Sequence, residues 1–156
     1  MADPPSDLLE SIIGIAPDSP LARLRAQRPD IVRHTQGSHD VLLFPSDPGG
    51  LSPSERALIA AQVAEHFGHP ALTQHYRGLL AERGDPPPGT RRDTISQHVA
   101  RVTMAPGTAL PQHIDALRTI GLDARDIVAL TQIIAFVSYQ VRAAVGLALL
   151  AQDTAA

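Results

Sequence analysis

Residues Asp123 to Gln152 read DARDIVALTQIIAFVSYQVRAAVGLALLAQ, and this stretch decides the fold class. Between Ile127 and Leu150 only six residues interrupt the apolar run: Thr131, Gln132, Ser138, Gln140, Arg142 and Gly146. At an advance of about 100° per residue, most of the apolar side chains fall on one wide arc of a single helix. Gln140 is the polar residue inside that arc. An arc this wide needs neighbours on most sides, so we expect the helix to lie in the core.

A membrane-spanning helix is the alternative interpretation of the same stretch. Against it, Arg142 lies well inside the run, and an arginine at the centre of a bilayer costs roughly 2.5–3.5 kcal/mol. Asp123 and Asp126 suit the N-cap and the positive end of a helix dipole. We therefore favour a core helix and expect no association with a membrane.

The composition excludes several kinds of chemistry. All 13 residues counted as lysine or arginine are arginines, so the chain has no lysine for a Schiff base or a phosphate-binding loop. Cysteine is also absent, which excludes disulfides, thiolate nucleophiles and zinc sites of the Cys type. A formal net charge of −3 gives no reason to expect a nucleic-acid partner. The opening residues, MADPPSDLLES, do not resemble a secretory leader, so we expect a cytoplasmic protein.

Proline, glycine and capping residues divide the rest of the chain into short helices. The expected N-caps are Ser6, Ser19, Ser52, His69, Thr90 and Asp123, and Ser52 forms a capping box with Glu55. Gly37 is a point at which the third segment can break in two. The expected helices cover about 7–15, 20–27, 29–44, 52–67, 70–83, 90–104, 111–120 and 123–152.

No segment alternates between apolar and polar residues as a half-buried strand would. We therefore predict an all-α protein with seven or eight helices, folded as a single domain over residues 1–156. Residues 1–45 are expected to form a helical cover over a core made by residues 51–152. The cover should turn its apolar side chains inward: Leu21, Leu24, Ile31, Val32, Val41, Leu42 and Phe44.

Two stretches together resemble the carboxymuconolactone decarboxylase and alkylhydroperoxidase D (AhpD-like) family. Leu51 to Glu82, LSPSERALIAAQVAEHFGHPALTQHYRGLLAE, resembles the central helix pair, in which Leu-Ser-x-x-Glu-Arg opens an apolar helix. In the family that helix passes through a glycine into Cys-x-x-Cys, with a histidine about one turn later. The long last helix resembles the second hallmark helix of the peroxidase-related branch. The resemblance implies an AhpD-like helical bundle and a homo-oligomer, from dimer to hexamer.

The sequence departs from the family at its reactive residues. With Gly68 on the family glycine, His69 occupies the first cysteine position and Leu72 the second. The family histidine then falls near His75 or Tyr76. Reduction of a hydroperoxide by a thiolate needs both sulfurs, so we expect no thiol peroxidase activity.

Three residues around the helix junction are the candidate catalytic set: Glu65, His69 and His75, with His66 beside them. His69 at a helix N-cap would favour a neutral imidazole, which is the form that acts as a base. Such a group could carry out acid–base chemistry at a carbon next to a carbonyl. The alternative is that His69 is a helix cap and the other histidines are surface or packing residues. A metal site is not favoured, because His66 and His69 straddle a helix break, and we expect no cofactor.

On the long helix, Gln132, Tyr139 and Arg142 share one arc. They form the candidate binding set for an anionic or carbonyl ligand, with Arg142 as its anchor. The alternative is structural: a buried arginine paired with an acid and carbonyls, while small residues let another helix approach closely. These residues are Thr131, Ala135, Ser138 and Gly146. His98 lies on an apolar face and is expected to be a hydrogen-bonded core histidine rather than a ligand.

The leading functional hypothesis is a family member that has lost its dithiol chemistry. It would act on, or bind, a small organic acid or lactone. The alternative is a non-catalytic oligomeric subunit that supports a Cys-containing, alkylhydroperoxidase-like paralogue. A partly polar cavity near His69 and Arg142 would favour the first hypothesis, and a filled core would favour the second.

Overall fold

The computed structural model describes residues 7–153 and shows, within that range, helices and no β-strand. This confirms the all-α fold class. The helices are α1 (Leu8–Ile13), α2 (Pro20–Ala26), α3 (Pro29–Leu43), α4 (Pro53–His66), α5 (Pro70–Arg83), α6 (Thr90–Met104), the short 3₁₀ helix η1 (Pro106–Thr108), α7 (Pro111–Thr119) and α8 (Ala124–Asp153).

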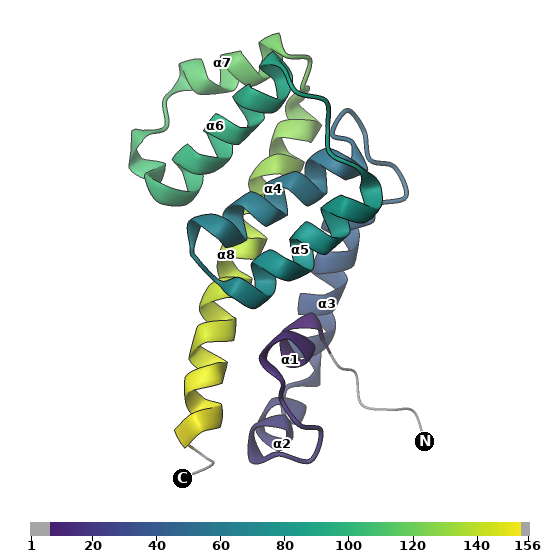
Figure 1. The fold of residues 1–156 in the computed structure, drawn as a ribbon, viewed down its shortest axis with the longest axis vertical. Helices are drawn as coiled ribbons and strands as arrows, with labels where there is room; N and C mark the ends of the chain where they lie inside the picture. Colours follow the sequence, from purple (N-terminus) through teal and green to yellow (C-terminus); the bar gives the residue numbers. More distant parts are fainter. Residues whose placement is uncertain (1–6, 154–156) are drawn as a thin grey trace.

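Helices α4 and α5 form a hairpin at the centre of the molecule, and α8 passes beside α4 along the long axis (Figure 1). α6 packs on α4 and carries α7, whereas α1, α2 and α3 contact α8. Every residue from Glu55 to Ala61 is buried, so α4 is enclosed on all sides. The centre of the fold is therefore shared between α4 and α8.

One face of the long helix is buried over its first five turns, whereas Val128 and Tyr139 on its other side are 55% and 44% exposed. Its inward residues include Leu130, Ile133, Val137 and Ala144, each fully buried. Beyond Ala144 the apolar side chains emerge, and Val145 and Leu149 are 49% and 62% exposed. By length and composition α8 could also cross a membrane, although 39% of its most apolar window is buried in this fold. The predicted core position holds for the part of the helix that packs on α4.

The local signals at helix ends predicted most of the caps. Glu55 N–H donates to Ser52 Oγ (3.2 Å) and Ser52 N–H donates to Glu55 Oε2 (2.8 Å), which confirms the capping box. Asp123 caps α8, because its Oδ1 accepts from the N–H of Asp126 at 2.9 Å. Thr90 is instead the first residue of α6, after Gly89. Ser6 lies outside the described residues, and Asp7 caps α1.

The N-terminal cover differs from the prediction in one respect. α3 is continuous through Gly37, so its buried stripe follows one helical period: Val32, Thr35, His39 and Leu43. Leu21 and Val32 are buried as expected, and Leu42 packs partly buried against the core. The other predicted inward residues are more than half exposed: Leu24, Ile31, Val41 and Phe44. Of these, Leu24 and Ile31 line an open groove beside α8.

Candidate functional site

The junction between α4 and α5 has the predicted conformation. Gly68 has a φ of 65°, the left-handed conformation in which glycine ends a helix without strain. His69 Nδ1 then accepts a hydrogen bond from the N–H of Leu72 at 3.3 Å, and Pro70 takes the first helical position. His69 is thus a helix N-cap whose Nδ1 is occupied. This junction sets the direction of α5, and with it the position of His75 and Tyr76.

The structure does not connect the predicted catalytic residues to one another. Glu65 forms an ion pair with Arg77 on α5, and His66 is exposed. Within residues 7–153, no hydrogen bond or ring contact joins His69 to Glu65, His66 or His75. His75 instead contacts residues of the interior.

Five side chains from three helices meet around His75, and we call them the histidine cluster: His39 on α3, His75 and Tyr76 on α5, and Phe136 and Gln140 on α8. The ring centroid of His39 lies 5.9 Å from that of His75 and 6.5 Å from that of Phe136. The rings of His75 and Tyr76 meet edge to face at 4.9 Å. Tyr76 and Gln140 are fully buried and His39 is 6% exposed.

The cluster contains more hydrogen-bonding capacity than the fold uses. Tyr76 donates its hydroxyl proton to Gln140 Oε1. However, His39 Nε2, His75 Nε2 and Gln140 Nε2 are buried without a hydrogen-bond partner among the described residues. Buried polar atoms are rarely left unpaired, because each one costs free energy comparable to a lost hydrogen bond. Three such atoms in one cluster are hydrogen-bonding capacity that the fold leaves unused, and His39, His75 and Gln140 line neither of the two grooves described below.

The protonation states follow from the neighbours. His39 Nδ1 lies 2.9 Å from Asp40 Oδ1, and because an ionised carboxylate only accepts, Nδ1 carries the proton. In the neutral tautomer with this proton, Nε2 of His39 carries the lone pair. Burial, followed by the nearby His39, lowers the pKa of His75 below its ordinary value, and the charge of Glu82 opposes this. Burial raises the pKa of Tyr76, and the hydrogen bond with Gln140 opposes this. The neutral form of His75 is therefore favoured, and Tyr76 keeps its phenolic proton.

The predicted binding set is distributed over three places. Gln132 lines an open groove of about 560 Å³ between α3 and α8, together with His34, Gly37 and Phe136. Tyr139 is directed to α3, where its hydroxyl lies 3.3 Å from Thr35 Oγ1. Arg142 is exposed, lies over the ring of Phe67 (4.9 Å) and donates to the carbonyl oxygen of Ser138 at 3.0 Å. The structural alternative holds only in part: Arg142 bonds a carbonyl oxygen, but it is exposed and forms no ion pair among residues 7–153.

His98 is buried at 6% exposure, as predicted. Burial, with His113 and Arg101 as smaller causes, lowers its pKa. Its Nδ1 has no hydrogen-bond partner among the described residues, so the expected hydrogen bond at that atom is not found. In the same range, no group of three or more His, Asp or Glu side chains has a metal-binding arrangement.

His39 was missed by the sequence analysis, which assigned the N-terminal segment a covering role only. Its signal was present, because His39 falls on the buried stripe of α3 at helical spacing from Val32, Thr35 and Leu43. Gln140 gave a similar signal as the polar residue within the apolar arc of α8. Which other residues these two side chains contact depends on tertiary packing.

Comparison with known proteins identifies the fold. No protein-family model matches the chain, and no curated protein matches it. A solved structure of an uncharacterized peroxidase-related protein from Silicibacter sp. TM1040 is similar, with a TM-score of 0.60 and 19% sequence identity. The match covers 93% of this chain and 85% of the other. At this identity the likeness shows the fold alone, and the chain has the all-α, AhpD-like fold.

Proposed function

We propose that this protein is a sulfur-free member of the carboxymuconolactone decarboxylase/AhpD-like family that performs acid–base chemistry on a small organic acid or lactone. The observation that carries the proposal is the pair of buried, unpartnered Nε2 atoms on His39 and His75, whose ring centroids are 5.9 Å apart. The proposal keeps His75 from the predicted catalytic set. It replaces His69 and Glu65, which are engaged in a helix cap and an ion pair.

Each polar group of the histidine cluster has a role in this proposal. His39, oriented by Asp40, abstracts a proton from the carbon next to the substrate carbonyl through its free Nε2. His75 is the second group of the cluster that can take up or release a proton, through its unpartnered Nε2. Gln140 Nε2, an unused donor, hydrogen-bonds the carbonyl oxygen as negative charge develops on it. Phe136 belongs both to the cluster and to the open groove beside α3, so a substrate would enter past its ring.

Thiol-dependent hydroperoxide reduction is not part of the proposal. The similar structure is described as peroxidase-related, but this chain has no cysteine to be oxidised or to resolve an oxidised partner. Acid–base catalysis by imidazole needs no sulfur.

The experiment follows exchange of the α-proton of a carboxylated γ-lactone, 5-oxooxolane-3-carboxylate, in D₂O by proton NMR. Wild-type protein should accelerate the exchange, and His39→Asn and His75→Asn should each reduce it by about 10²–10⁴-fold, the usual contribution of one general base. His66→Asn is the matched control, since His66 is exposed and outside the cluster, and should exchange like wild type. Equal exchange with and without protein, or with and without the two histidines, would refute the acid–base role.

The second candidate is a non-catalytic subunit in a homo-oligomer or in a complex with a Cys-containing paralogue. The exposed apolar residues at the end of α8, Val145 and Leu149, favour it because they would be covered in an assembly. Neither of the two grooves described is lined by His69 or Arg142. Sedimentation velocity of wild type and Val145→Gln/Leu149→Gln tests it: dissociation in the variant supports an interface there, and a monomeric wild type removes the homo-oligomer.

A further inference from the structure

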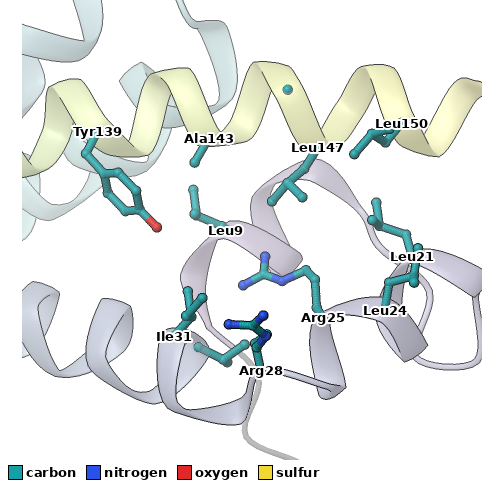
Figure 2. Close-up of a pocket in the computed structure, with 12 residues that line it drawn as sticks. Leu9, Leu21, Leu24, Arg25, Arg28, Ile31, Tyr139, Ala143, Leu147 and Leu150 are labelled. Atoms are coloured by element: carbon teal, nitrogen blue, oxygen red, sulfur yellow. The ribbon is translucent and has the colours of Figure 1, made fainter.

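A second, more apolar groove lies at the other end of the molecule from α6 and α7. It has a volume of about 480 Å³ and runs between the C-terminal half of α8 and the helices α1, α2 and α3. We call it the apolar groove, and its walls include Leu9, Leu21, Ile31, Ala143, Gly146 and Leu147. Figure 2 shows Ala143 and Leu147 on α8 facing Leu9 from the opposite side. A groove of this size and lining is typical of a small-molecule site.

Two arginines supply the charge in this apolar lining. Arg25 and Arg28 present their guanidinium groups on the wall opposite α8 (Figure 2). Arg25 is already neutralised, because its Nη2 lies 2.6 Å from Asp7 Oδ2 and its Nε lies 3.2 Å from Glu10 Oε1. Its Nη1 is buried and has no hydrogen-bond partner among the described residues.

Arg28 is the second guanidinium of the groove, at an exposed position. Its side chain makes no ion pair or hydrogen bond with residues 7–153. It stands at the N-cap of α3 without a side-chain capping bond of its own. A guanidinium without an ion pair among the described residues, beside an apolar groove, matches one negative charge at the end of an apolar chain.

We propose that the apolar groove binds an unbranched alkyl carboxylate, a fatty-acid-like monoanion. The alkyl chain lies between Leu9, Leu21 and Leu147, and the carboxylate accepts hydrogen bonds from Arg28, with Arg25 Nη1 beside it. This site is separate from the histidine cluster and does not depend on the acid–base proposal.

The binding experiment uses dodecanoate below its critical micelle concentration, measured by isothermal titration calorimetry on the full chain. We expect saturable binding of one dodecanoate per chain. Dodecanol, which has the same chain without the charge, should bind about tenfold more weakly or worse, since a charge-assisted hydrogen bond is lost.

Two pairs of variants locate the ligand. Arg28→Gln should weaken dodecanoate about tenfold, whereas Arg23→Gln, the same charge change on α2 outside the groove, should not. Gly146→Leu should abolish binding, because Gly146 lines the groove and a Cβ there meets no heavy atom within 4 Å. Leucine has a higher helix propensity than glycine, so this variant keeps α8. Gly78→Leu is its control, on α5 with equally open surroundings.

Three results would overturn the proposal. One is the absence of saturable dodecanoate binding to the wild type. Another is unchanged binding in Gly146→Leu, or equal loss in Arg23→Gln and Arg28→Gln. The third is that Gly146→Leu changes the oligomeric state in sedimentation velocity while dodecanoate does not bind, which would assign the groove to a second copy of the chain.

Discussion

Tyr76 and Gln140 form the most enclosed polar pair of the histidine cluster, and both are fully buried. Removing the phenolic hydroxyl leaves Gln140 with both ends of its amide unpaired. We therefore expect Tyr76→Phe to lower the free energy of unfolding by about 1–3 kcal/mol, the cost of a buried group left unsatisfied. Urea denaturation measures this loss in the free energy of unfolding. Tyr139→Phe is the comparison: it removes a hydroxyl that lies 3.3 Å from Thr35 Oγ1 on a side chain that is 44% exposed, so the loss should be smaller than for Tyr76→Phe.

The pair can also be removed as a unit. Tyr76→Phe combined with Gln140→Leu leaves no polar group at this contact, so the double variant should be more stable than Tyr76→Phe alone. A double variant less stable than the sum of the two single changes would show that the hydrogen bond is not what stabilises this contact.

The buried histidines make stability depend on pH. The pKa values of His75 and His98 are lowered from an ordinary value of 6.5 mainly by burial, so the unfolded chain binds more protons than the folded one as pH falls through that value. The free energy of unfolding should therefore be fully retained above about pH 7 and decrease below 6.5, by at most about 1.4 kcal/mol per pH unit for each histidine.

Denaturation at several pH values tests this dependence. The variant His75→Asn/His98→Asn should flatten the slope between pH 7 and about pH 5, whereas His34→Asn, at an exposed position, should keep it. A steeper slope in the double variant would contradict the assignment. Loss of stability at lower pH is assigned to Glu55. Burial alone would raise the pKa of this carboxyl, but hydrogen bonds from Arg91 and Ser52 outweigh burial and lower it.

At the scale of single helices, α4 depends on the cap at its first turn. Ser52→Ala removes the acceptor for the Glu55 N–H and one half of the capping box. We expect a loss of about 1 kcal/mol in the free energy of unfolding. Ser38→Ala, an exposed position inside α3, is the control and should be neutral. An unchanged midpoint for Ser52→Ala would mean that tertiary packing alone fixes the start of α4.

The helix ends were predictable because their determinants are local. Ser52 with Glu55, Gly68 before His69, and Asp123 before Asp126 all act within a few residues of one another. The contacts between elements were not predictable in this way. Arg56 donates to the carbonyl oxygens of Leu42, Pro48 and Leu51 and so fixes the segment between α3 and α4.

Contacts that join distant parts of the chain explain why the site was only half predicted. His75 was identified from its place after the α4–α5 junction, but His39 stands 36 positions earlier in the sequence. It reaches His75 only because α3 packs on α4 and α8. Likewise, Gly50 N–H donates to Asp126 Oδ1 at 2.8 Å, and a Cβ on Gly50 would lie 2.4 Å from Asp126 Oδ2. Periodicity within one helix does not indicate which other helix it meets.

For the whole molecule, the fold and the chemistry have to be considered separately. The AhpD-like arrangement is present without any sulfur nucleophile. We expect purified protein to show no reduction of cumene hydroperoxide above the dithiothreitol background in a peroxide-consumption assay. Activity that saturates with hydroperoxide and survives in His39→Asn/His75→Asn would show that another group in this chain performs the reduction.

The most direct test of the account is a histidine-ring NMR titration of the whole protein, repeated with 5-oxooxolane-3-carboxylate. We predict that His75 titrates below its ordinary pKa, that His39 carries its proton on Nδ1, and that the lactone shifts the signals of both rings while leaving those of the exposed His66 unchanged. If His75 titrates at or above 6.5 and neither ring responds to the lactone, the histidine cluster is packing alone and the proposed acid–base function is wrong.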